Sequence, residues 1–424
     1  MQIFAVLTAA HTEAYLDIPR QLHEQTNCEQ KINSFSKPPF SDKMKEKGAL
    51  QMQELLDWLE YLEDGRQQGK VRHKLKDILV IVLFATLANA DDWVEIAMFA
   101  DYYQDYFRKY IPLENGIPSH DTIGRVMGMI SPEIIQQLYM KWQECLDRND
   151  GELLKKIICI DGKTMCGNRR NEEKPAHIVT AWSKEDGFSL GQKAVNEKSN
   201  EITAIPELLG KIQIKGQVVT IDAMGAQTAI AEKIKSKRAD YVLGLKKNQG
   251  TLYENVREYF LDSEFLKRIQ EKGVYKKTEE KAHGQLEKRE YYQTEDIKWL
   301  EQKGAWKGLK SIIMERKTIK KGNKERVEYR YFISSLKEDI ELASRAVRGH
   351  WCIESMHWHL DVTFREDANA TIDKTAAQNL NIIRKWCLSI LKVTELSKRK
   401  LSMKKKRFAI SLRPTMLLEI VLNA

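Results

Sequence analysis

One stretch near the C-terminal end, residues 348–367, constrains the fold of this 424-residue chain more than any other. In a helix with about 100° between residues, its ionisable side chains gather on one narrow side. This polar stripe consists of His350, Glu354, His357, Asp361 and Arg365. The rest of the circumference is apolar and includes two tryptophans, which is more apolar surface than a helix on a protein's exterior usually carries. The pattern predicts a buried helix with a single polar stripe.

A buried stripe of two carboxylates, two imidazoles and a guanidinium is costly unless these groups face a metal, a ligand or one another. One interpretation is an internal ion-pair network in which Arg365 pairs with Asp361 or Glu354. The other is a binding or catalytic site. The helix alone leaves both interpretations open.

The composition predicts a folded protein with a polyanionic partner. Hydrophobic residues make up 42% of the chain, enough for sizeable cores. Lys and Arg number 69 against 60 Asp and Glu, a net charge of +9 that favours nucleic acid as a partner without requiring it.

The cysteines and the apolar runs predict a cytoplasmic protein without a membrane segment. The six cysteines form no CxxC pair and no disulfide-like spacing, which indicates reduced thiols and no structural zinc site. Residues 1–10 lack the basic start of a secretory signal. The most apolar run, residues 78–90, is shorter than the roughly 20 residues that cross a bilayer, so we expect a core helix there.

Before residue 150 the sequence predicts helices. Residues 1–48 show no clear periodicity and form a poorly defined extension, whereas residues 49–150 repeat apolar positions at helical spacing. We interpret this second segment as a helical domain that binds DNA, although a packing lobe would have the same pattern. Its basic cluster at residues 70–74 fits either a phosphate contact or a solvated turn.

After residue 151 the pattern changes to alternating strands and helices. Three strands are expected first, followed by helix, strand, helix, strand and a further helix. This βββαβαβ-α order is the ribonuclease H-like arrangement, an α/β fold with a mixed sheet covered by helices on both faces. We assign residues 151–261 and 336–395 to this domain, residues 262–335 to a β-rich insertion, and residues 396–424 to a basic C-terminal tail.

Three carboxylates are expected to converge in this domain. Asp161 and Asp222 each end a predicted strand, and α/β proteins place their sites at such sheet edges. Glu354, on the polar stripe, is the candidate for the third position. Hard oxygen ligands of this kind suit Mg²⁺ or Mn²⁺, and two such ions support in-line attack on a phosphodiester. Without metal, repulsion should raise at least one carboxyl pKa.

Each of these motifs is weak by itself, because an Asp-Gly pair after a strand is usually a turn and Asp222 could cap a helix. Their order within one βββαβαβ pattern is more specific. With flanking motifs, the set resembles the DDE transposases of bacterial insertion sequences, in the H-repeat-associated branch, from about residue 51 to residue 392. The motifs are Ile160-Asp161-Gly162-Lys163, Thr220-Ile221-Asp222-Ala223-Met224-Gly225, residues 240–249, His283-Gly284 with Glu287 and Arg289, His350-Trp351-Cys352-Ile353-Glu354, and His357-Trp358-His359-Leu360-Asp361.

The resemblance implies a catalytic, metal-binding triad of Asp161, Asp222 and Glu354 with two Mg²⁺ or Mn²⁺ ions. It also implies cleavage and joining of double-stranded DNA at terminal inverted repeats and a target, by at least a homodimer that associates with the nucleoid. Related transposases carry Arg and Lys where this chain has His350 and Asp361.

Several further side chains are expected to contact DNA. Lys246, Lys247 and Asn248 follow a strand at the same sheet edge as the aspartates, although they could form a solvated basic turn. Three residues of the stripe could serve phosphate, namely His350, His357 and Arg365. Two other functions remain open: a catalytically inactive DNA-binding protein derived from a transposase, and a nuclease or resolvase that cleaves without joining.

Overall fold

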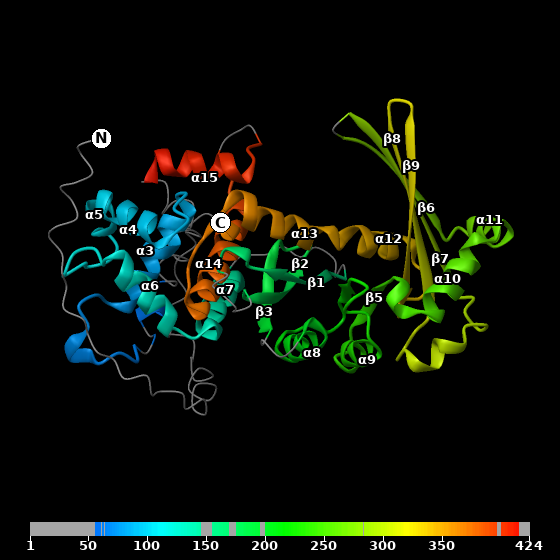
Figure 1. Cartoon of the computed structure of the whole chain (residues 1–424), viewed down its shortest axis with the longest axis horizontal. Coiled ribbons are helices and arrows are strands. Elements are labelled where there is room, and N and C mark those ends of the chain that lie inside the picture. Colours follow the sequence, from blue (N-terminus) through cyan, green and yellow to red (C-terminus); the bar gives the residue numbers. More distant parts are fainter. Residues whose placement is uncertain are drawn as a thin grey trace, which may run out of the picture.

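The computed structural model describes residues 56–60, 62, 64–145, 155–168, 175–195, 200–282, 284–396 and 400–414. The predicted extension at residues 1–48 and the predicted boundary near residues 148–151 lie outside this part of the chain. The described part is elongated, with a group of helices at one end, an α/β unit in the middle and a projecting β-ribbon at the other end (Figure 1).

A nine-stranded mixed sheet forms the backbone of the α/β unit, in the order β3-β2-β1-β4-β5-β9-β8-β7-β6. β1 is antiparallel to β2 but parallel to β4, which in turn is parallel to β5. The first five strands and the helices between and after them follow the predicted βββαβαβ-α order. They are β1 Ile157–Thr164, β2 His177–Ser183, β3 Phe188–Val195, α8 Glu201–Lys211, β4 Val218–Ile221, α9 Thr228–Ser236, β5 Asp240–Leu245 and α10 Thr251–Leu261.

The central strands are buried on both faces, as expected for parallel strands between two layers of helices. Side chains alternate along β1: Ile158 and Ile160 pack with α8, α9 and α10, whereas Ile157 and Cys159 pack with the helices of the opposite layer. That opposite layer contains α12 Ile340–Gly349, α13 Trp351–Trp358 and α14 Lys374–Val393.

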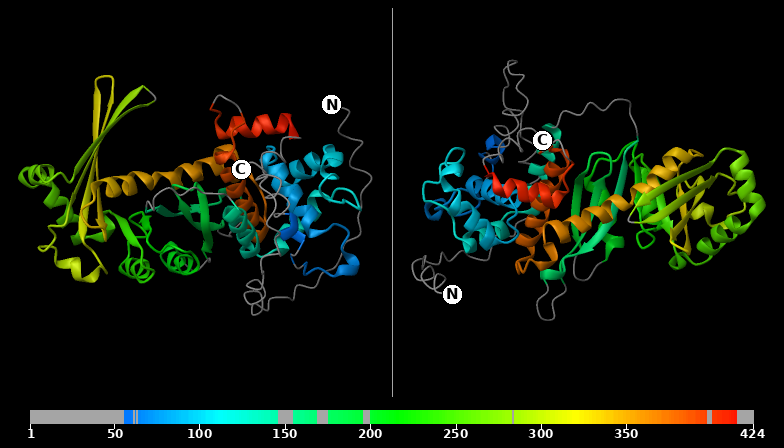
Figure 2. Two further views of the ribbon diagram at one scale, coloured as in Figure 1. Left: turned by 180° about the vertical axis from the view of Figure 1, so that it is seen from behind. Right: turned by 90° about the horizontal axis from the view of Figure 1, so that it is seen from above.

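The predicted β-rich insertion extends the same sheet. Three of its strands coincide with predicted ones, but a fourth strand and helix α11 were not predicted, because β6 has the sequence YKKTEEKA with no apolar alternation. The insertion's elements are α11 Ser263–Glu271, β6 Tyr275–Ala282, β7 Gln285–Thr294, β8 Ser311–Lys321 and β9 Lys324–Ser334. β9 pairs with β5, and the β8–β9 ribbon projects from the body in the left view of Figure 2.

The N-terminal helices pack around α14, most of whose side chains are buried. They are α3 Leu75–Leu87, α4 Trp93–Tyr102, α5 Gln104–Phe107, α6 His120–Met129 and α7 Pro132–Cys145. Ser119 caps α6, its hydroxyl accepting from the Thr122 N–H. None of the helices in the described residues is both long and apolar enough to span a membrane.

The segment expected to be a basic tail contains a packed helix, α15 Met403–Leu412. Its Arg407 is fully buried and lies 2.9 Å from Asp91, and it also donates to the Thr86 carbonyl. Lys406 donates to the Thr394 carbonyl. Part of the basic sequence therefore stabilises the helical end of the molecule through buried hydrogen bonds, which a charge count does not reveal.

The stretch at residues 348–367 is less regular and less buried than predicted. α13 passes into a π-helical turn, His359–Thr363, and Arg365 then adopts a left-handed conformation with φ 50°. Ile353, Met356, Leu360 and Phe364 are buried against the sheet and α14, but Trp358 is 55% exposed and Val362 44% exposed. One side of this helix faces solvent, so the prediction of burial all round is wrong.

Candidate active site

Asp161 and Asp222 leave neighbouring strands side by side. In the parallel pairing of β1 with β4, Ile160 lies opposite Ile221, and each aspartate is the next residue. Because Ile160 and Ile221 face α8 and α9, strand alternation directs both aspartates to the opposite face, where α13 lies. β1 continues to Thr164 through its pairing with β2, so Asp161 does not end its strand as predicted. It marks the point where the parallel pairing ends.

The loop after β4 fixes Asp222. One carboxylate oxygen, Oδ1, accepts hydrogen bonds from the backbone N–H groups of Met224 (3.0 Å) and Gly225 (3.1 Å). The Asn248 side-chain amide donates to the Ala223 carbonyl at 2.8 Å, which ties this loop to the turn after β5. Asn248, expected to contact DNA, therefore has a structural partner beside Asp222.

Glu354 lies on α13, which packs on β1. Cys159 and Cys352 make the closest described contact between these elements on the aspartate side, with their sulfur atoms 3.5 Å apart. Each cysteine precedes one of the carboxylates, Asp161 or Glu354, by two residues. The Cys159–Cys352 contact therefore joins the strand and the helix that carry two of the three predicted acids.

Burial and neighbouring carboxylates both raise the pKa values of Asp161 and Glu354. The pKa of Asp161 is raised to about 7, chiefly by burial, with smaller contributions from the charges of Asp222, Glu201 and Glu354 and an opposing one from the Gly162 N–H. The pKa of Glu354 is also raised, mainly by loss of water and partly by Asp222, while Arg330 and Lys246 oppose the shift. Like charges are thus concentrated where a cation would relieve them.

His350 and His357, the two histidines predicted to contact DNA phosphate, lie beside these acids as neutral imidazoles. His350 Nδ1 is 3.0 Å from the Thr220 hydroxyl, and burial lowers the pKa of His350 to about 4. His357 Nδ1 is 3.6 Å from Asp161 Oδ2, and burial lowers the pKa of His357 to about 3. A neutral imidazole can contact a phosphate through a hydrogen bond but not an ion pair, and in this structure the two rings lie against Thr220 and Asp161.

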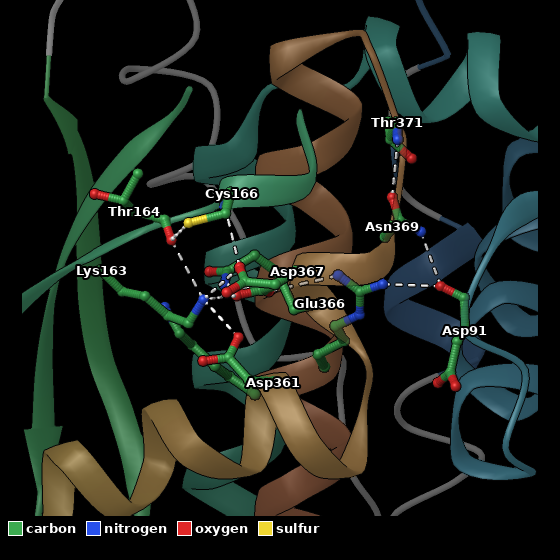
Figure 3. A network of polar contacts seen from close by, with 12 residues as sticks. Asp91, Lys163, Thr164, Cys166, Asp361, Glu366, Asp367, Asn369 and Thr371 are labelled. Carbon is green, nitrogen blue, oxygen red and sulfur yellow. Dashed lines mark hydrogen bonds and ion pairs between the residues drawn. The ribbon is translucent and has the colours of Figure 1, made fainter. Parts of the chain in front are cut away.

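Asp361 is part of a separate ion-pair network, shown in Figure 3. The Lys163 ammonium, only 10% exposed, lies 2.7 Å from Asp361, 3.3 Å from Glu366 and 3.1 Å from Asp367. Arg384 approaches Glu366 from the other side at 3.5 Å. The network connects β1, two residues after Asp161, with the π-helical turn that follows Glu354. Lys163 belongs to the motif Ile160-Asp161-Gly162-Lys163, but the motif does not indicate that this lysine has three carboxylate partners.

The polar stripe therefore divides into parts with different partners. His350, Glu354 and His357 face the aspartates, and Asp361 pairs with Lys163. Arg365 lies 4.0 Å from Glu95 of α4 and is 62% exposed. The alternative in which Arg365 pairs with Asp361 or Glu354 is wrong, because the helix ends before Arg365.

Two cations lie near Glu354. The sequence predicted a role for Lys246 but not for Arg330. Lys246, which follows β5, is exposed, as is Lys247. Arg330 of β9 lies over the Trp351 ring at 4.7 Å from its centroid. Sequence reasoning could not find Arg330, because its position depends on how the insertion pairs with β5.

The donor chemistry of Asp161, Asp222 and Glu354 fits a divalent cation that prefers oxygen ligands. The raised pKa of Asp161 agrees, since a bound cation would replace the proton that burial favours. Across the described residues, however, no three His, Cys, Asp or Glu groups are already close enough to form a metal site. Asp161 and Asp222 lie on the face of the sheet that packs against the helix with Glu354, but the three acids are not drawn together.

A mixed α/β fold with acidic side chains at the carboxyl edge of its parallel strands is a common design for enzymes. Comparison with known proteins gives the family. The model described as Transposase DDE domain matches residues 152–390, and the one described as DDE_Tnp_1-associated matches residues 56–143. The chain belongs to the DDE transposase family.

Individual relatives agree with the predicted branch. Putative transposase YncI of Escherichia coli O157:H7 is 40% identical over 370 residues, covering 85% of this chain and 93% of that protein. H repeat-associated putative transposase YhhI of Escherichia coli (strain K12) is 35% identical over 370 residues, covering 85% and 96%. Inactive transposase YbfQ of the same strain is 38% identical over 78 residues, covering 18% of this chain and 93% of that protein.

Proposed function

We propose that this chain is a DNA transposase that cleaves and joins phosphodiester bonds at the ends of an insertion sequence. The observation that carries the proposal is the β1–β4 register, which directs Asp161 and Asp222 from adjacent strands toward the helix with Glu354. Family membership supports DNA as the substrate and a ribonuclease H-like catalytic domain. The helical segment before that domain, which the DDE_Tnp_1-associated model matches, is proposed as a DNA-binding domain.

In this proposal Asp161, Asp222 and Glu354 bind two Mg²⁺ or Mn²⁺ ions. Such ions, when bound, polarise the phosphate and lower the pKa of a nucleophilic hydroxyl. The protein's part is to position the ligands. The N–H groups of Met224 and Gly225 orient Asp222, and neutral His357 lies against Asp161 without competing as a cation. The Cys159–Cys352 contact and the Lys163 network locate α13 on β1 from either side of Glu354.

The DNA partner would run along the acidic edge, with Lys246 and Lys247 on its backbone. We propose double-stranded DNA with terminal inverted repeats and a target as substrates, a homodimer when two ends are paired, and a cytoplasmic, nucleoid-associated location. The DNA contacts of His350, His357 and Asn248 remain predictions, and these side chains would also position Thr220, Asp161 and the loop after Asp222. The predicted DNA contact of Arg365 remains a prediction, and its place beside Glu95 sets it apart from the other candidates.

One relative named as an inactive transposase keeps a second candidate in view, a DNA-binding protein that no longer cleaves. A third is a nuclease or resolvase that hydrolyses without joining. The presence of all three carboxylates in the sequence, with Asp161 and Asp222 on the face of the sheet that packs against the helix with Glu354, favours the active enzyme over the inactive protein.

The test uses the purified chain and a plasmid carrying the DNA that flanks its gene, where short inverted repeats are expected. Asp161→Asn, Asp222→Asn and Glu354→Gln should each lower strand cleavage by more than about 100-fold, since even groups that only support metal ligands account for 10- to 100-fold. Duplex binding should persist. A chelator should abolish cleavage, and joined products should appear only with Mg²⁺ or Mn²⁺.

Glu232→Gln, at an exposed position on α9, is the matched control and should cleave like the wild type. Cleavage that survives any one of the three substitutions would refute the triad. Binding without cleavage in the wild type would instead support the inactive protein, and cleavage without joining would support the nuclease.

A further inference from the structure

Arg330 reaches the acidic site from the insertion because of strand register. In the antiparallel pairing of β5 with β9, Leu245 lies opposite Tyr331. Continuing that register by one residue places Lys246 opposite Arg330, and residues opposite each other in antiparallel strands point to the same face. Tyr331 packs in the core on the α10 side, so Arg330 points to the α13 side.

The Arg330 guanidinium is fixed in place but has few polar partners. It stacks on Trp351, which precedes Glu354 by three residues and so lies near it on the surface of α13. Its one carboxylate within ion-pair distance in the described part of the chain is Glu328, at 4.0 Å. The side chain is 38% exposed. Most of its five N–H donors are therefore available to a ligand.

The charge of Arg330 acts on the catalytic side of α13. Arg330 stacks on Trp351 of the helix that carries Glu354, and the continued β5–β9 register places Lys246 beside Arg330. Two cations thus flank a carboxylate that is proposed to bind metal. A ligand that fits between these two cations and a metal bound at Glu354 would be an anion with more than one free oxygen atom. A DNA phosphodiester has this chemistry.

We propose that Arg330 is a substrate-binding residue that, with Lys246, contacts the DNA phosphate placed at Glu354. The insertion would then complete the active site. Its strand β9 supplies a guanidinium, and none of the segments β1, β4 and α13 contains an arginine. This inference rests on the proposed function, because it names the part of the DNA that this site takes.

The experiment compares Arg330→Ala and Arg330→Lys with the wild type in two measurements. The first is the salt dependence of binding to a short duplex from the DNA flanking the gene, without divalent metal. Loss of one phosphate contact should reduce the slope of log affinity against log salt by about one. The second is strand cleavage with Mg²⁺, which should fall about 10- to 100-fold for Ala, the range expected for a lost charge-assisted hydrogen bond. Lys should lie between, because it keeps the charge but not the two-pronged geometry.

Arg326→Ala is the matched control. Arg326 has the same strand and face as Arg330 but lies four residues further out, about 13 Å away, and its guanidinium pairs with Glu328 at 2.9 Å. It should keep the wild-type slope and cleavage rate. Thermal unfolding of each variant shows whether the fold is retained.

An unchanged slope of log affinity against log salt for Arg330→Ala would overturn the proposal. If cleavage and melting temperature fall while this slope stays the same, Arg330 only holds the insertion against Trp351. Equal effects of Arg330→Ala and Arg326→Ala would also overturn it. If the wild type fails to cleave, the proposed function fails, but the slopes of the two variants still decide whether Arg330 binds phosphate.

Discussion

The Lys163 ammonium lies 2.7 Å from the Asp361 carboxylate and so joins β1 to the π-helical turn that follows the helix with Glu354. Two further carboxylates, Glu366 and Asp367, share the same ammonium. Removing a partner from such a buried network leaves uncompensated charges, which usually costs more than the intact network contributes.

Lys163→Met should therefore lower the free energy of unfolding by about 3–5 kcal/mol, measured by urea denaturation. Cleavage should fall as well, because Lys163 would no longer hold the turn that follows α13 against β1. Lys193→Met is the control: Lys193 pairs with the half-exposed Glu207, and such a surface pair contributes about 1 kcal/mol or less. Similar losses in both variants would contradict this account of the network.

Asp161 should make the metal-free protein less stable as pH rises. Its pKa is about 7 in the folded chain against an ordinary 3.8, so between these values the folded state binds more protons than the unfolded state. The wild type should lose stability relative to Asp161→Asn from about pH 4 to 7, by on the order of 2 kcal/mol after allowing for solvent screening, and the difference should be constant above pH 7.

Urea denaturation in a chelator across this range measures the effect. Asp240→Asn is the control, because Lys235 and Lys155 hold the pKa of Asp240 at about 2, so its contribution is complete above pH 4. Its difference from the wild type should not change between pH 4.5 and 8. Saturating Mg²⁺ should remove the Asp161 effect, and a stability difference independent of pH would refute the assigned shift.

The sequence predicted the part of the site that depends on local pattern. Asp161 and Asp222 each follow a short apolar run typical of a buried strand, and the structure pairs those two strands side by side. Glu354 could be placed on a helix from spacing alone. The fold order was predictable for the same reason, since each strand and helix there carries its own apolar periodicity.

What sequence could not provide is the pairing between distant segments. The β5–β9 register places Arg330 over Trp351, near Glu354, and Lys163 pairs with Glu366 and Asp367 because the chain turns sharply at Arg365. Neither a strand register across an insertion nor a left-handed residue leaves a periodic signal. β6 was missed because the strand has no buried face to give it alternation.

Gly167 lies where two short turns approach each other closely, next to the Lys163 network. It lies in the turn Cys166–Asn168, and a Cβ there would come 2.5 Å from the carbonyl oxygens of Asp367 and Asn369. Since backbone must shift, Gly167→Ala should destabilise the protein by about 1–3 kcal/mol. Gly210→Ala, in α8 with no atom within 4 Å of the new methyl group, should instead stabilise it by about 0.5–1 kcal/mol. Thermal or urea unfolding compares the two, and equal effects would contradict the close approach at Gly167.

Lys385 should give the opposite pH dependence in a different range. It is buried in α14, where its ammonium contacts the Thr180 hydroxyl at 2.7 Å and the Gln192 amide oxygen at 2.6 Å. Burial lowers the pKa of Lys385 from 10.5 to about 7, with Lys163 adding to the shift and Glu366 opposing it. Between these values the unfolded state binds the extra proton, so stability should rise with pH.

The rise attributable to Lys385 should approach about 1 kcal/mol per pH unit between pH 7.5 and 9.5. Lys385→Met removes the titrating group while keeping most of the side-chain volume, so subtracting its urea-denaturation curve from that of the wild type isolates this residue from the other lysines. A difference that stays flat across that range would show that Lys385 keeps an ordinary pKa, and that water or a carboxylate reaches its ammonium inside the fold.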